Sequence, residues 1–69
     1  MNLNLRQAII RRVNDKSDEE LFAVIEDSIG GDERALPGLG VLFEIIWKNS
    51  EKSTQTLMVH TLKNHLTAT

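Results

Sequence analysis

Acidic side chains are the first candidates for chemistry in this chain of 69 residues, which holds ten Asp and Glu residues. Two pairs of carboxyl groups could be offered for general acid–base work, Glu44 with Glu51 and Glu20 with Asp27. A general acid needs a pKa that burial has raised, whereas every acid here falls on a polar helix face or in a helix cap. We therefore predict no catalytic residue and no enzyme activity, unless the fold brings reactive groups together from distant positions.

The two histidines, His60 and His65, are the candidates for binding a metal ion. Zinc-binding helices align two imidazoles at a spacing of four residues, whereas a spacing of five sets them about 140° apart. The chain has no cysteine, which excludes thiolate ligands and disulfides. We expect no metal site.

The segment Gly38-Leu39-Gly40 precedes a helical pattern, as the glycines of a phosphate-binding loop do. Such loops also need a preceding strand, and the nucleoside-triphosphate version needs Gly-Lys-Ser or Gly-Lys-Thr. Neither feature is present. We interpret Pro37-Gly38 as a turn and Gly40 as a place where helices pack closely, and we expect no cofactor and no small-molecule substrate.

Basic residues gather in the first sixteen positions and are the candidates for contact with nucleic acid: Arg6, Arg11, Arg12 and Lys16. On a helix the three arginines project in three directions, whereas tracking a phosphate backbone needs them on one face. Residues 17–33 carry seven acids and no base, a run that repels DNA. We therefore expect the basic first helix to lie against the acidic second one, and DNA association through these four residues is the alternative.

Caps and apolar periodicity predict one all-α domain over residues 1–69, with helices spanning about residues 4–14, 17–29, 38–49 and 51–66. Asn4 and Ser17 are typical N-caps, Ser17 and Glu20 have capping-box spacing, and Gly30-Gly31 suits a helix end. The last helix presents one apolar stripe: Met58, Val59, Leu62 and Leu66.

The third predicted helix is apolar around roughly two-thirds of its circumference, far more than the ~100° stripe of a surface helix. Two explanations stay open. Either it is the very apolar central helix of a small bundle of three to four helices, or a second subunit covers part of it in a homodimer. In the second case the self-association surface is drawn from Phe43 with Trp47 or from Val41 with Ile45.

A small domain without cysteine suits a reducing compartment better than a secreted setting. Residues 1–6 hold no apolar run of signal-peptide length, and no segment approaches the length of a membrane span. The composition, 41% hydrophobic and 26% charged, is that of a globular rather than a disordered chain. We expect a protein that stays inside the cell that makes it, without a membrane partner.

Two segments carry a family resemblance: the opening NLNLRQA, residues 2–8, and the string LPGLGVLFEIIWKN, residues 36–49. Both are similar to the small, acid-soluble spore protein I family of endospore-forming bacteria, and the likeness covers essentially the whole chain. The last helix departs most, since Ser53-Thr54-Gln55-Thr56 stands where a more acidic run is expected of the family.

The resemblance implies a minor protein made in the developing forespore and held in the spore core, with no enzyme activity, cofactor or catalytic residue. The major spore proteins that coat DNA look like a different family, and none of their motifs is present here. Our hypothesis is a non-enzymatic structural or interaction protein of the spore core, with a protein partner of unknown identity. The alternative is a DNA-associated spore protein that binds through the basic first helix.

Overall fold

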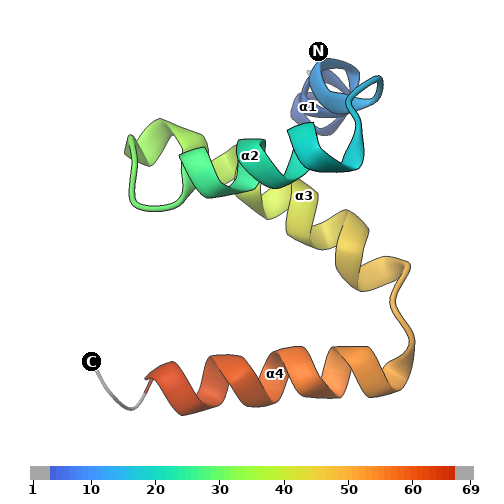
Figure 1. Cartoon of the computed structure of the whole chain (residues 1–69), viewed down its shortest axis with the longest axis vertical. Coiled ribbons are helices and arrows are strands. Elements are labelled where there is room, and N and C mark those ends of the chain that lie inside the picture. The colour runs from blue at the N-terminus through green and yellow to red at the C-terminus, as the bar shows by residue number, and fades with distance from the viewer. Residues whose placement is uncertain (1–3, 67–69) are drawn as a thin grey trace.

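The computed structural model describes residues 4–66, and this part of the chain is helical without strands (Figure 1). The elements are α1 (Leu5–Val13), α2 (Asp18–Ser28), a short 3-10 turn η1 (Glu33–Ala35), α3 (Leu36–Lys48) and α4 (Lys52–Leu66). The all-α prediction is confirmed. Residues 1–3 and 67–69 of the expected domain lie outside the described residues.

The first two helices begin at side chains that accept hydrogen bonds from free backbone amides. The Asn4 carboxamide accepts from the amide of Gln7 at 3.2 Å. Ser17 and Glu20 form a reciprocal capping box, in which the Ser17 hydroxyl accepts from the Glu20 amide and the Glu20 carboxylate accepts from the Ser17 amide. Both starts follow from local sequence alone.

Glycine and proline set the remaining boundaries before α3. Gly30, just after α2, has a φ of +74°, a left-handed conformation that glycine adopts without a Cβ clash. Pro37 lies in the first turn of α3, where its missing amide proton costs no helical hydrogen bond. The third helix therefore begins at Leu36 instead of about residue 38, because Pro37-Gly38 is helical and not a turn.

Helix α3 is the element that η1, α1 and α2 each contact. Val41 is 8% exposed and is the one buried side chain in residues 4–66. Gly38 lies beside α1, since a Cβ placed on it comes 3.9 Å from Cδ1 of Ile9. The interpretation of Gly40 as the close-packing glycine is wrong, because nothing lies within 4 Å of the corresponding position there.

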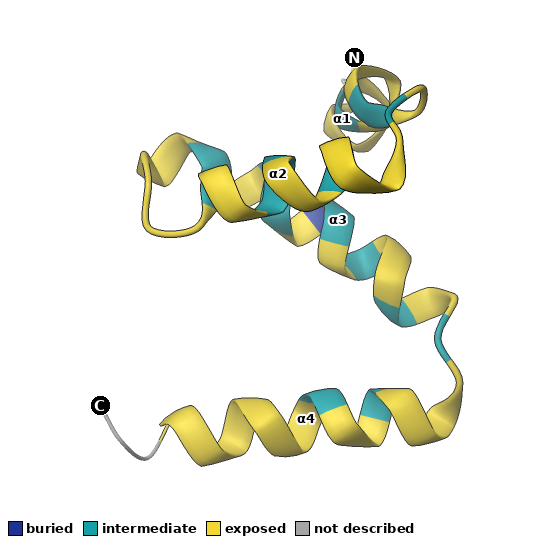
Figure 2. Ribbon diagram, in the orientation of Figure 1, coloured by how far each residue is buried: buried dark blue, intermediate teal, exposed yellow. Residues whose placement is uncertain are grey.

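The finer expectation, a third helix surrounded by its neighbours, is not confirmed. Phe43 is 50% exposed and Ile46 is 42% exposed. The reason is the direction of α4, which leaves α3 at Asn49 and runs apart from the other helices (Figure 1). Figure 2 shows α4 exposed along almost its whole length. Within residues 4–66 no helix is both long and apolar enough to cross a membrane.

Replacing Val41 by alanine should lower the free energy of unfolding by about 2 kcal/mol, because lost methyl contacts and a new cavity add up. The same substitution at Val59, which is 49% exposed, should cost less than about 0.5 kcal/mol in dilute protein. Urea unfolding followed by circular dichroism measures both changes. Equal losses at the two valines would contradict the packing of α3 described above.

Candidate interaction site

An open apolar groove of about 740 Å³ lies between α3 and α4. The side chains that line it come from both helices: Gly40, Phe43, Glu44, Trp47, Met58, Val59 and Leu62. Helical spacing explains the set, because residues three or four apart share one side of a helix. Glu44 is the one charged residue among these seven, so the groove offers hydrocarbon and aromatic surface to whatever occupies it.

Two aromatic rings form the α3 wall of the groove. The ring centroids of Phe43 and Trp47 are 5.8 Å apart with a tilt of 43°, which is within the favourable range for an aromatic pair. Phe43 is half exposed, and Leu62 on the opposite wall is 58% exposed. Large apolar side chains are therefore gathered in one place and remain in contact with water.

Side-chain hydrogen bonds surround the end of α3 and the start of α4. The Asn49 carboxamide donates to the carbonyl of Ile45 at 2.8 Å, and the Ser50 hydroxyl donates to the carbonyl of Ile46 at 2.6 Å. Gln55, in the first turns of α4, donates from Nε2 to the carbonyl of Trp47 at 2.7 Å. The same three carbonyls also accept from the backbone amides of Asn49 or Ser50, so the side chains are second donors to the end of α3. The bond from Gln55 joins the start of α4 to that end.

The residues predicted for self-association divide between three places. Phe43 and Trp47 line the groove, whereas Val41 belongs to the core beneath α1 and α2. Ile45 is 38% exposed and lines a different hollow, which it shares with Ile10, Leu21, Ile25 and Ile46. The structure adds Met58, Val59 and Leu62 to the candidate surface, a stripe visible in the sequence but without a sign of what it faces.

The basic residues of α1 do not form one surface. Arg6 is bound by Glu44 of α3, with its Nε 2.6 Å from Oε1 and its Nη2 2.9 Å from Oε2. This bidentate contact lowers the pKa of Glu44 and raises the pKa of Arg6, in both cases chiefly through the hydrogen bonds. The first helix is thus joined by an ion pair to the third helix. The charge pattern in the sequence had predicted that it would lie against the second helix.

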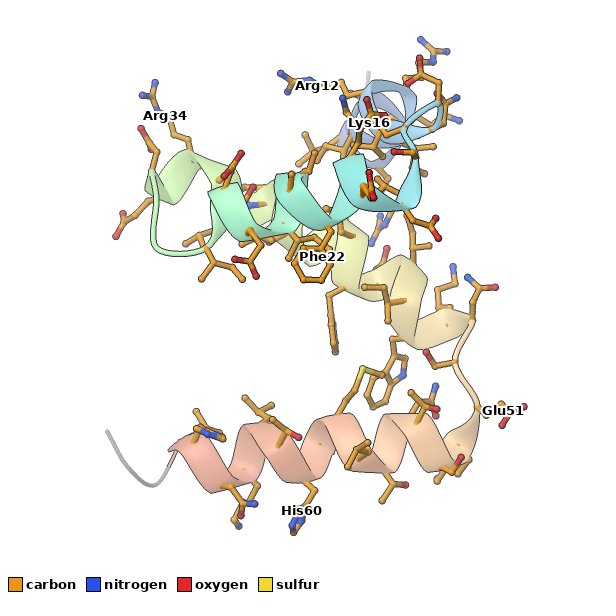
Figure 3. All side chains as sticks on the ribbon, in the orientation of Figure 1. Arg12, Lys16, Phe22, Arg34, Glu51 and His60 are labelled. Carbon is orange, nitrogen blue, oxygen red and sulfur yellow. The ribbon has the colours of Figure 1, made fainter. Side chains whose placement is uncertain are left out.

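The other cations of α1, and Lys16 in the connection after it, make no ion pair in the described part of the chain. Arg11 and Arg12 are exposed and Lys16 is half-buried. Arg12 and Lys16 line a second hollow with Arg34 (Figure 3), whose guanidinium is held by Asp32 at 2.8 Å. This contact lowers the pKa of Asp32 through its hydrogen bonds with Arg34.

The acids and histidines considered for catalysis or metal binding are dispersed or engaged. Glu20 is part of a helix cap and Glu44 is bound to Arg6. His60 points away from α3 (Figure 3), and Nδ1 of His65 lies 2.8 Å from the carbonyl of Thr61. No group of three His, Asp or Glu residues able to hold a metal ion occurs within residues 4–66. The structure thus defines a small helical protein with an open apolar groove between α3 and α4.

Comparison with known proteins assigns the family. Residues 3–66 match the family described as small, acid-soluble spore protein I. A protein of that name from Bacillus licheniformis is 51% identical over 69 residues, covering 99% of both chains, and one from Bacillus subtilis is 46% identical over 67 residues, covering 96% of this chain and 94% of its own. The chain belongs to the small, acid-soluble spore protein I family, a family of spore proteins. No solved structure is significantly similar to it.

The ion pair between α1 and α3 should make stability depend on pH. The folded state lowers the pKa of Glu44 below its ordinary value of 4.5, so the contribution is complete above pH 4.5 and is lost as the pH falls through the lower, folded-state pKa. Glu44→Gln should therefore lower the thermal midpoint at pH 7 and leave it unchanged at a pH well below that folded-state pKa.

Thermal unfolding followed by circular dichroism at both pH values measures this difference. The control is the double variant Arg6→Gln with Glu44→Gln, which should be no less stable at pH 7 than either single variant, since each removes the same pair. If Glu44→Gln lowered the thermal midpoint equally at high and low pH, the ion pair would not be the source of the stability that Glu44 contributes.

Proposed function

We propose that this chain is a non-enzymatic protein of the spore core whose role is carried by contacts with protein. Membership of a spore protein family supports the location. One observation supports the mode of action, namely the exposed apolar groove between α3 and α4. Soluble chains rarely leave a contiguous apolar patch in water unless another surface covers it.

The absence of a catalytic role is part of the proposal and is supported by the surroundings of the polar groups. An active site needs polar groups that converge on a pocket and have shifted pKa values. Glu44 is the ionisable residue that lines the groove, and its pKa is lowered by Arg6, the opposite of what a general acid needs. The groove is therefore suited to recognition of apolar surface.

Association with DNA is the second candidate, and one observation favours it. Arg11, Arg12 and Lys16 have no ion-pair partner within residues 4–66, so their charges are available to phosphate. Two observations weigh against it: Arg6 is occupied by Glu44, and α2 places five acids without a base on the same molecule. Coulomb repulsion from these acids opposes the approach of a polyanion.

We expect no binding of duplex DNA at micromolar protein in about 0.15 M salt, the ionic strength at which basic proteins typically still bind non-specifically. Fluorescence anisotropy of a labelled duplex measures this directly. Binding that weakens with added salt and is lost in the Arg11→Gln, Arg12→Gln variant would favour the DNA candidate over the one proposed.

The contact role is tested by cross-linking inside spores. Leu62→Lys puts a charge into the groove, whereas His60→Lys adds the same charge two residues away on the side of α4 that points away from α3 (Figure 3). Decoated spores carrying an epitope-tagged chain should yield cross-linked protein adducts with the wild-type chain and with His60→Lys. The adducts should fall at least about tenfold with Leu62→Lys, because burying an unpaired ammonium opposes association.

Two outcomes count against the proposed function. The first is equal adduct formation by Leu62→Lys and the wild-type chain, which removes the groove from the contact. The second is loss of the tagged chain with the spore coat during decoating, which removes the core location.

A further inference from the structure

We propose that a second copy of this chain occupies the groove, in a two-fold dimer in which α4 of each chain lies against α2 and α3 of the other. The inference rests on the proposed contact function and names its partner. Four properties of the single chain carry it: its surface area, its shape, the position of its exposed apolar side chains, and the distribution of its charges.

The surface area of the chain exceeds that of a compact monomer. The chain exposes 5928 Å², whereas a folded monomer of 7.8 kDa exposes about 4,400 Å². The excess of about 1,500 Å² is larger than the ~800 Å² per partner that a standard stable interface buries. A second copy can therefore be accommodated without unfolding any element described here.

The shape of the chain is also more extended than that of a compact monomer. The radius of gyration is 13.6 Å, compared with about 11 Å for a compact domain of this length. The expansion comes from α4, which stands apart from α1 and α2 (Figure 1) and presents its apolar stripe to water. Its first turns are held to the end of α3 by the bond from Gln55 to the Trp47 carbonyl. The stripe is consequently available to another chain.

Exposed apolar side chains continue from the groove onto α2 and along α4. Phe22 is 68% exposed, and Figure 3 shows it pointing from α2 toward the side on which α4 lies. Ile29, the residue that follows α2, is 63% exposed, and Leu66 extends the α4 stripe at 58%. The surface thus has three parts, the α2 flank, the α3 wall and the α4 stripe, and a helix of the width of α4 can cover the first two.

Charge complementarity selects a second copy as the occupant. Five acids lie on α2 with no base among them: Asp18, Glu19, Glu20, Glu26 and Asp27. Helix α4 carries Lys52 and Lys63 and no acid. No ion pair joins α2 to α4 within the chain as described, so the opposite charges of the two helices are free to meet across an interface.

A two-fold arrangement uses this complementarity twice. In an isologous interface, α4 of the first chain meets α2 of the second, and α4 of the second meets α2 of the first. The same acids repel nucleic acid and anionic lipid surfaces. A basic, amphipathic helix is the matching occupant, and this chain contains one.

Sedimentation velocity of the purified chain between about 1 and 200 µM, the range that separates weak from moderate affinities, measures the association. The mass should rise from 7.8 kDa toward twice that value. The emission of Trp47, the one tryptophan of the chain, should shift to the blue over the same range. Leu62→Lys should weaken the dimer at least about 30-fold, as a hot-spot substitution does, and His60→Lys should leave it within about threefold.

A charge-reversal experiment tests the arrangement itself. Glu26→Lys and Lys63→Glu each bring like charges together in a homodimer and should each weaken association. A one-to-one mixture of the two variants restores opposite charges at both contacts, so it should form a heterodimer of near wild-type affinity. Native mass spectrometry of an isotopically labelled mixture distinguishes this heterodimer from either homodimer.

A chain that stays monomeric over the whole range, or a dimer unaffected by Leu62→Lys, overturns the inference, as does a mixture that associates no better than its components. A monomer in solution whose groove-dependent adducts persist in spores also overturns it, since the occupant is then a different protein; the proposed function stands in that case. Loss of the adducts together with a monomer in solution contradicts both.

Discussion

The structure depends on one constraint: α3 is apolar on most of its circumference, and the chain is too short to cover it. Helices α1 and α2 contact it, and Val41 is its buried side chain. Beyond that point Phe43 and Trp47 face the groove, because α4 is the remaining helix and it diverges from the bundle. A chain of this size buries only ~60% of the surface that its unfolded form exposes. In this structure part of the surface that stays exposed is the apolar surface of α3.

Features that depend on neighbouring residues could be predicted from the sequence. The cap at Ser17, the left-handed Gly30 and the break at Asn49 each result from groups within four residues of one another. Pro37 was harder to interpret, because a proline suits both a turn and the first turn of a helix. The pairing of Arg6 with Glu44 joins positions 38 residues apart, and the charge pattern alone favoured a different partner for α1.

The α3 side of the candidate site could be predicted from the sequence, but the pairing of α3 with α4 could not. The width of the apolar arc indicated that a short chain cannot cover all of the third helix. It pointed to Phe43 and Trp47 as one pair of residues that could stay uncovered. It did not separate them from Val41, because all three lie on a helix that is apolar nearly all round. The α4 stripe at Met58 and Leu62 has the periodicity of any amphipathic helix, and this periodicity is the same whether the stripe faces a core or a partner. The direction of α4 decides between the two, and a hydrogen bond from Gln55 to the Trp47 carbonyl joins the start of that helix to α3.

The separation of charge along the chain acquires a physical role if the groove is a contact between copies. Acids on α2 and lysines on α4 are exposed, so water screens them and they add little to the stability of the single chain. They do make one pairing of two chains more favourable than random hydrophobic association, which is the use of charge that most affects specificity. Burial of the α3 wall by a partner would also add to the stability of each chain, because binding to the folded state alone shifts the folding equilibrium by mass action. A small domain in which residues 4–66 bury a single side chain would then be most stable where it is most abundant. Its accumulation and its folded state would be linked through one apolar surface.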